Sequence, residues 1–198
     1  MGCSMNKEAF DKLRVPGEVN WDDACVIRDT ILEHKPETVL ELGCFRGMST
    51  LVIIDALWRI RHSRLTTSPF DWKFTSVDIV PMGELFNMRD IKHARRAEHV
   101  PPDAPVTHIV SDALKYLNGL PDGSIDLIFE DTNHQTAYTT KLIPEMLRVL
   151  KEKGVLIFHD LNLGTIQRAY RKTGLLKKVK DFPPSRMGML RKRCGAWI

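Results

Sequence analysis

The chain alternates short apolar runs with longer segments of helical spacing. The short runs predict strands over Thr38–Leu42, Phe74–Ile79, Val106–Val110, Ile125–Phe129 and Val155–Phe158. Such runs, bounded by turn residues, are typical of strands that are buried on both faces of a parallel sheet. The pattern therefore indicates an α/β fold.

The segments between these runs predict helices. In Asp22–His34 the residues Ala24, Ile27 and Ile31 form an apolar stripe, and acidic residues stand in the first turn. Further helices are predicted from Met48 to His62, from Ala113 to Leu117, from Ala137 to Lys151 and from Leu163 to Lys172. Pro144 inside the fourth of these segments predicts a kink or a late start, because an interior proline costs about 3 kcal/mol.

The C-terminal part predicts two more strands, Leu176–Phe182 and Met187–Arg193, which we expect to pair antiparallel. The chain then forms a doubly wound, mostly parallel seven-stranded sheet with a C-terminal antiparallel hairpin and helices on both faces. Residues 80–105 are the least regular stretch. We expect one domain overall, with residues 1–36 as an N-terminal helical cap segment and 37–198 as the main domain.

Composition is that of an ordinary globular protein, with 198 residues, 27% charged and 43% hydrophobic. The net charge of +4 is modest, and basic segments such as 59–64 and 89–96 are interpreted as solvated helix faces, so nucleic acid is not an expected partner. The four cysteines show no C-x-x-C spacing, which favours reduced thiols. No apolar run is long enough for a bilayer, and the expectation is a cytoplasmic protein without membrane association.

The most informative segment is the one from Glu41 to Ser49, which reads E-L-G-C-F-R-G-M-S. It predicts a strand, a glycine loop and a helix N-terminus, where α/β folds bind nucleotide-like ligands. Its spacing differs from those of dinucleotide-binding and phosphate-binding loops. Glu41 would repel a pyrophosphate, so the loop suits a ligand with a cationic end and hydroxyl groups.

Acidic residues stand at or just after five successive predicted strands. Ligands of open α/β sheets bind at the carboxyl ends of the strands, so this row points to one site. The residues are Glu41, Asp78, Asp112, Asp131 and Asp160.

These motifs, together with Ser111-Asp-Ala113, His134 and Gly154-Val-Leu-Ile-Phe-His-Asp160, resemble class I S-adenosylmethionine-dependent methyltransferases. Within that superfamily the pattern is similar to small-molecule O-methyltransferases of the macrocin, cephalosporin-hydroxylase-like and catechol types. The resemblance implies a Rossmann-like fold and the cofactor S-adenosyl-L-methionine. It also implies a small-molecule hydroxyl acceptor, of a sugar or natural-product type, and is compatible with a homodimer.

The resemblance also implies a set of cofactor-binding residues. Glu41 would lie near the methionine amino group, Asp78 would accept the ribose hydroxyls, and residues 111–113 would border the adenine. The full set is Glu41, Gly43, Cys44, Phe45, Gly47, Ser49, Asp78, Ile79, Ser111, Asp112, Ala113 and Asp131.

For catalysis, His134 is the candidate general base, because an imidazole near its free pKa suits proton removal at neutral pH. Metal-dependent relatives bind a divalent ion such as Mg²⁺, for which Asp131, His159 and Asp160 are the candidate ligands here. Catechol-type enzymes carry Asp-Asn after the fifth strand and the macrolide-type branch carries Glu-Asp, so His159 departs from both patterns and puts the metal in doubt.

Simpler interpretations stay open for several of these residues. Asp112 and Asp131 are also suited to cap the helices that follow them, and His134 and His159 to serve as hydrogen-bonded structural residues. Two other functions stay open for the chain, namely a nucleic-acid or protein methyltransferase and a non-catalytic module that binds the cofactor.

Overall fold

The computed structural model describes residues 6–14, 18–63, 72–81, 105–193 and 196–197. Its strands are β1 (Thr38–Leu42), β2 (Lys73–Asp78), β3 (Val106–Val110), β4 (Ile125–Glu130), β5 (Leu150–Phe158), β6 (Lys180–Asp181), β7 (Gly188–Arg193) and β8 (Ala196–Trp197). Its helices are α1 (Lys7–Leu13), α2 (Trp21–His34), α3 (Met48–Ser63), α6 (Ala113–Asn118), α7 (Thr136–Val149) and α8 (Gly164–Lys172), with a 3₁₀ turn η1 (Leu176–Lys178).

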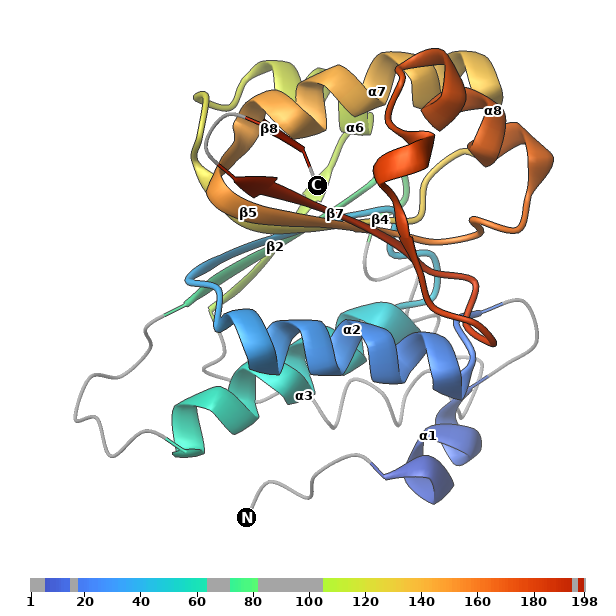
Figure 1. The fold of residues 1–198 in the computed structure, drawn as a ribbon. Coiled ribbons are helices and arrows are strands. Elements are labelled where there is room, and N and C mark those ends of the chain that lie inside the picture. The colour runs from blue at the N-terminus through green and yellow to red at the C-terminus, as the bar shows by residue number, and fades with distance from the viewer. Residues whose placement is uncertain (1–5, 15–17, 64–71, 82–104, 194–195, 198) are drawn as a thin grey trace.

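The strands form one sheet in the order β3-β2-β1-β4-β5-β7-β6, and the two-residue β8 pairs with β7. β1 to β5 run parallel, whereas β7 runs antiparallel to both β5 and β6. Helices α2 and α3 cover one face of the sheet and α6, α7 and α8 cover the other (Figure 1). The predicted doubly wound α/β fold with its C-terminal hairpin is confirmed.

Two apolar layers hold the helices to the sheet. In β5, Val155 and Ile157 join the cluster that contains α2 and α3, whereas Leu156 and Phe158 join the cluster that contains α7 and α8. Successive side chains of a strand point to opposite faces. The same alternation directs His159, the next residue of that series, toward the face that α2 covers.

The predicted strand Leu176–Phe182 is wrong for most of its length, because residues 176–178 form η1 and only Lys180–Asp181 is β6. Leu176 and Val179 both pack against the cluster beneath α8. Residues three apart share one side of a 3₁₀ turn but lie on opposite faces of a strand. The turn is therefore the conformation that brings both side chains to the core.

The boundary between α7 and β5 also differs from the prediction. The helix ends at Val149, and β5 begins at Leu150, where Leu150 pairs with Ile125 ahead of an irregularity in the ladder. The helix starts at Thr136 and continues through Pro144, so the late start does not occur, and the alternative, a kink at Pro144, stays a prediction.

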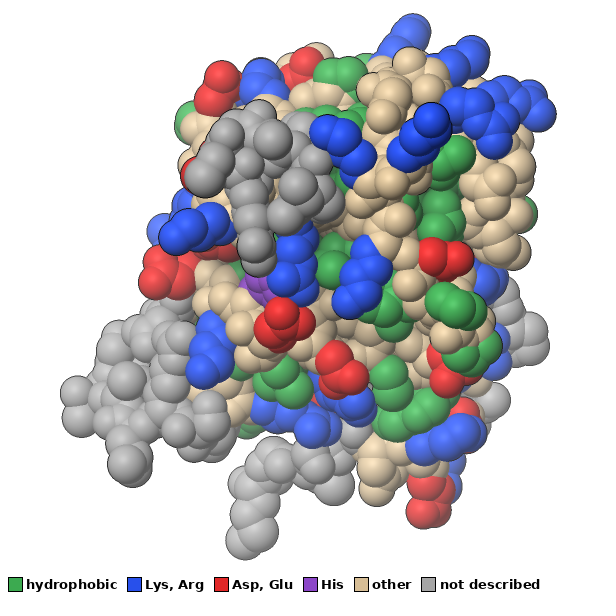
Figure 2. All heavy atoms as spheres, viewed as in Figure 1, with side chains coloured by type: hydrophobic (Ala, Val, Ile, Leu, Met, Phe, Trp, Pro, Cys, Tyr) green, Lys and Arg blue, Asp and Glu red, His purple; other side chains and the backbone are tan. Residues whose placement is uncertain are grey.

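None of the described helices combines the length and the apolar character that crossing a bilayer requires. Lys and Arg side chains are spread over the face seen in Figure 2, with fewer Asp and Glu side chains among them. Most of the irregular stretch 80–105, including the basic segment 89–96, lies outside the described residues. The division into a cap of residues 1–36 and a main domain stays a prediction.

Candidate functional site

The glycine loop joins β1 to α3 and lies against the end of β4. Gly43, Phe45 and Gly47 adopt left-handed backbone angles, with φ of 81°, 47° and 79°. A side chain at Gly43 would press into the carbonyl oxygen of Asp131 and place its Cβ 2.8 Å from the carbonyl carbon. Only glycine combines this φ with so close an approach of two backbones.

Asp78, at the end of β2, fixes the loop from the side. Its Oδ2 accepts hydrogen bonds from the backbone N–H groups of Cys44 (2.9 Å) and Phe45 (3.0 Å), and its Oδ1 accepts one from Val80 N–H (3.1 Å). The carboxylate is half-buried and borders an open pocket. Each carboxylate oxygen has lone pairs for more than one donor, so Asp78 retains capacity for ligand hydroxyls.

This first pocket, of about 410 Å³, lies above the ends of β1, β2, β3 and β4. Phe45 and Ile79, which expose 53% and 74% of their surfaces, form an apolar part of its lining. The lining comprises Gly43, Phe45, Val77, Asp78, Ile79, Val80, Ser111, Asp112, Ala113, Asp131, Thr132, Asn133 and Tyr138.

Asp112 has a structural role that the sequence left open. Its Oδ1 accepts from Lys115 N–H (2.9 Å) and so caps α6, while its Oδ2 accepts from the hydroxyl of Tyr138 (2.9 Å). Burial and the neighbouring Asp112 carboxylate raise the pKa of Tyr138 to about 12, so the phenol stays a donor. Asp112 therefore caps α6 and lines the first pocket at the same time.

Glu41 does not line this pocket. Its side chain is fully buried, and its oxygens accept hydrogen bonds from the hydroxyls of Ser49, Thr50 and Ser76, each at 2.7 Å. Burial raises the pKa of Glu41 to about 7, although the three hydroxyls oppose that rise. Glu41 and Ser49 thus tie β1 to α3 beneath the loop. Their cofactor contacts, and those of Cys44 and Gly47, stay predictions.

Three side chains meet at the ends of β4 and β5. The Nε2 atom of His134 lies 3.3 Å from Asp131 Oδ1 and 3.1 Å from Asp160 Oδ2. Hydrogen bonding to Asp131 raises the pKa of His134, and the charge of Asp160 adds to that rise. About 40% of the His134 side chain is exposed, and its partner Asp131 lines the first pocket.

His159 lies beside these three residues but has no nitrogen left for a metal. Nε2 is 3.1 Å from Asp23 Oδ2, and Nδ1 is 3.3 Å from Asp131 Oδ1 and 3.5 Å from Asp160 Oδ1. Burial lowers the pKa of His159, but these carboxylates outweigh burial and raise it to about 11. Among the described residues, the donor atoms placed so that they could share a cation belong to Asp131, His134 and Asp160, all within 4.8 Å of one another. His134 thus joins Asp131 and Asp160 as a candidate ligand by geometry, and the predicted set with His159 stays a prediction.

Two residues of this network escaped the sequence interpretation. Asp23 of α2 is fully buried against His159, and Arg186, between β6 and β7, contacts Asp23 (3.2 Å) and Asp160 (3.1 Å). A signal for Asp23 was present, because it precedes Ile27 by four residues on the apolar stripe of α2. For Arg186 we find no sequence signal, since it follows a proline-containing turn.

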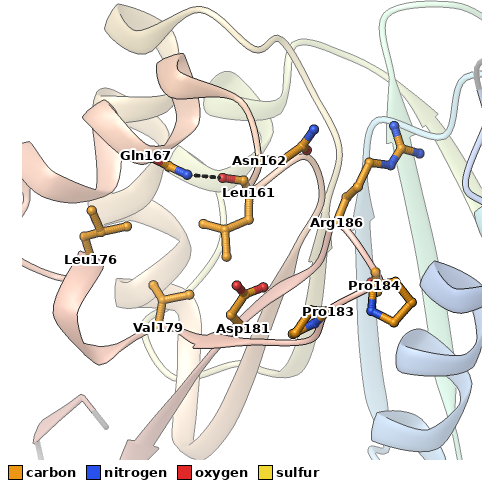
Figure 3. Close-up of a pocket in the computed structure, with 10 residues that line it drawn as sticks. Leu161, Asn162, Gln167, Leu176, Val179, Asp181, Pro183, Pro184 and Arg186 are labelled. Carbon is orange, nitrogen blue, oxygen red and sulfur yellow. Dashed lines mark hydrogen bonds between the residues drawn. The ribbon is translucent and has the colours of Figure 1, made fainter.

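A second pocket, of about 600 Å³, opens on the other side of Arg186, between the start of α8 and the segment that leads to β7. Figure 3 shows Leu161, Val179 and Asp181 facing a common space, with Gln167 donating a hydrogen bond to the Leu161 carbonyl (2.9 Å). The Arg186 guanidinium extends away from Val179. Asp131 of the cluster lines the first pocket, and Asp160 contacts Arg186, which lines the second.

Comparisons with known proteins agree with this fold. The fold is similar to that of an SAH-bound methyltransferase from Podospora anserina (17% identity, TM-score 0.65, 94% of this chain and 86% of that chain covered). It is also similar to an O-methyltransferase from Bacillus cereus in complex with SAH (12% identity, TM-score 0.62, 93% and 90% covered). No curated protein matches the sequence. Residues 40–161, which include the glycine loop, Asp78 and the carboxylate cluster, match the family described as a methyltransferase domain, and the chain belongs to that family.

Proposed function

We propose that the chain transfers a methyl group from S-adenosylmethionine to a hydroxyl group of a small molecule. The observation that carries the proposal is Asp78, which stands in the first pocket beside the exposed Phe45 and Ile79. A carboxylate there suits the two hydroxyls of a ribose, and the apolar side chains suit an adenine ring. Two solved structures of similar fold hold S-adenosylhomocysteine (SAH), the demethylated product.

S-adenosylmethionine brings a methyl group that its sulfonium already activates, so the protein mainly aligns the acceptor and removes its proton. The acceptor oxygen forms the new bond to the methyl carbon as the carbon–sulfur bond breaks and its electron pair returns to sulfur. The proton of the hydroxyl passes to His134, which lies 3.3 Å from Asp131, a residue that lines the first pocket.

The carboxylates around His134 decide which nitrogen acts as the base. Ionised Asp131 and Asp160 only accept hydrogen bonds, so the Nε2 atom between them carries the proton of the neutral imidazole. Nδ1 then holds the lone pair that receives the acceptor proton. The same carboxylates stabilise the imidazolium that results, as they do in other carboxylate–histidine pairs.

The second pocket is the proposed site of the acceptor. Its walls combine apolar Leu161, Leu176 and Val179 with polar Asn162 and Asp181. This mixture suits an amphipathic molecule that carries hydroxyl groups. Arg186 of its lining contacts Asp160, which also contacts His134, and these contacts connect the second pocket to the proposed base.

A divalent ion is the alternative to this use of His134. Asp131, His134 and Asp160 offer one nitrogen and two oxygens, a mixed set that suits Mn²⁺ or Zn²⁺ better than Mg²⁺. When bound, such an ion acts as a Lewis acid that lowers the pKa of the acceptor hydroxyl. Such an ion would coordinate Nε2 of His134, so its binding should depend on the presence of that ring. Mn²⁺ would raise the melting temperature of the wild type and not of His134→Gln.

The proposal is tested with Asp78→Asn. Hydrogen bonds to a charged group contribute about 1.5–3 kcal/mol, so SAH should bind about 10- to 150-fold more weakly by calorimetry. Asp29→Asn is the matched control, because Asp29 is an exposed acid on α2 that pairs with Arg28. Failure of the wild type to bind either S-adenosylmethionine or SAH would overturn the proposal.

Methyl transfer itself is measured with methyl-labelled S-adenosylmethionine and a panel of catechols, phenols and glycosides. Binding of SAH without transfer to any of them would favour a non-catalytic module. Transfer to RNA, DNA or protein that falls steeply with added salt would instead favour a nucleic-acid or protein methyltransferase.

A further inference from the structure

Asp23 is more heavily bonded than its place in a helix requires. Its Oδ2 accepts from Asn20 N–H (2.9 Å), which completes the capping box of α2. Beyond this cap, Oδ1 accepts from the Ser185 hydroxyl (3.0 Å) and from Arg186 N–H (2.9 Å). His159 Nε2 and Arg186 Nη2 also contact Oδ2, at 3.1 and 3.2 Å. Most of these partners belong to the sheet edge and not to the helix.

The two cationic partners of Asp23 each have a second carboxylate partner in the candidate active site. The His159 ring lies between Asp23 on one side and Asp131 and Asp160 on the other. The Arg186 guanidinium joins Asp23 to Asp160 through its two terminal nitrogens. Asp23 is therefore connected to both carboxylates that hold His134, although it lies outside both pockets.

The end of β5 needs such support because its backbone is strained. Asp160 has a φ of 55°, in the left-handed region where a residue with a side chain costs about 1–2 kcal/mol. The next residue, Leu161, donates its N–H to the Arg186 carbonyl (2.8 Å). Strained residues of this kind persist only where their surroundings hold them, and they gather at active sites.

We propose that Asp23 is a positioning residue of the methyl-transfer site: through His159 and Arg186 it fixes the carboxylates of Asp131 and Asp160, and thereby the orientation of the His134 ring. This inference rests on the proposed function in that His134 is the group to be oriented. Asp23 touches neither cofactor nor acceptor, and its effect passes through two cations.

A purely structural role in α2 is the alternative, and matched variants separate the two. Asp23→Asn removes the charge that faces His159 and Arg186 while it keeps an oxygen for capping. Asn20→Ala removes the other half of the capping box and touches neither cation. Asp22→Asn removes an exposed charge from the same helical turn. If Asp23 acts only as a cap, Asn20→Ala should reproduce its effects.

The experiment is ¹⁵N NMR of the histidine rings at one neutral pH, combined with calorimetry of SAH. We expect Asp23→Asn to shift the ring signals of both His159 and His134 and to leave SAH affinity unchanged. Asn20→Ala and Asp22→Asn should leave the His134 signals in place, even where Asn20→Ala lowers the melting temperature. Unmoved His134 signals in Asp23→Asn, or equal shifts in Asn20→Ala, would overturn the inference.

A second pair of variants tests the inference even if Asp23→Asn fails to fold. The side chain of Arg186 is about one-third exposed, so its replacement leaves no closed cavity. Arg186→Gln should shift the His134 signals, and Arg186→Lys should restore them in part; no shift in Arg186→Gln would equally overturn the inference. The failure of SAH to bind the wild type would count against the proposed function alone, because the NMR result does not depend on it.

Discussion

Replacement of Gly43 by alanine is the sharpest test of how the glycine loop and the carboxylate cluster depend on each other. The new methyl group would press into the backbone of Asp131, whose carbonyl carbon would be 2.8 Å away. Ordinary contacts of a Cβ begin at 3.4 Å, so the loop and the end of β4 have to separate. The perturbation therefore moves the backbone of a residue that holds His134.

The expected loss in the free energy of unfolding has two parts, and a variant at a second glycine measures one of them alone. Gly174 has a φ of 75°, close to the 81° of Gly43, but a methyl group there meets nothing within 4 Å. Gly174→Ala should lower the free energy of unfolding by about 1–2 kcal/mol, the cost of a left-handed backbone. Gly43→Ala adds an overpacking cost of about 1–3 kcal/mol. We expect a total loss of about 2–5 kcal/mol for Gly43→Ala.

The assay is urea unfolding of both variants beside calorimetry of SAH. Gly43→Ala should be the less stable variant and should also bind SAH more weakly, because Gly43 lines the first pocket. Gly174→Ala should bind SAH as the wild type does. Equal losses of stability in the two variants, with unchanged SAH affinity in Gly43→Ala, would refute the reasoning about the close approach.

Three further predictions concern ionisable groups. His134→Gln should slow methyl transfer about 10²- to 10⁴-fold without loss of SAH affinity, which single-turnover assays measure. Because Asp131 raises the pKa of His134 above 6.5 and a base must be neutral, the rate should rise with pH through a midpoint above 6.5; a midpoint below it would contradict this role. Burial raises the pKa of Glu41 to about 7 from 4.5, so wild-type stability should fall between pH 4.5 and 7, and Glu41→Gln should lack that fall in urea unfolding. The raised pKa of His159 predicts a contribution to stability that is complete below pH 6.5 and is lost as the pH rises toward 11. The melting temperature of the wild type should decline over this range, and His159→Asn should lack that part of the decline.

The parallel part of the sheet could be predicted because its signals are local. Thr38–Leu42 and Val106–Val110 are strands with the predicted bounds, since each is a short apolar run between turn residues. The prediction of a strand over residues 176–182 was wrong because the conformation there depends on how Leu176 and Val179 pack against side chains of other elements. A pattern over seven residues does not contain that information.

The candidate site shows the same division. Gly43, Asp78, Asp131 and His134 stand in motifs whose spacing is readable, and the structure brings them to one edge. The roles of Glu41 and His159 depended on partners in other elements. Asp23 lies 136 residues from His159 and 163 from the backbone N–H of Arg186, so no local pattern could connect them.

The contact between α2 and the turn before β7 also sets the order in which the protein matures. Its two ends are 163 residues apart, and chains are synthesised at about 5–20 residues per second. Arg186 thus leaves the ribosome about 8–33 s after Asp23. Until then Asp23 has its capping partner Asn20 and, after His159 is made, one cationic partner, but it lacks the contacts with Ser185 and Arg186. Chains that stop before Ser185 should therefore lack the contacts that complete the docking of α2 against the turn before β7.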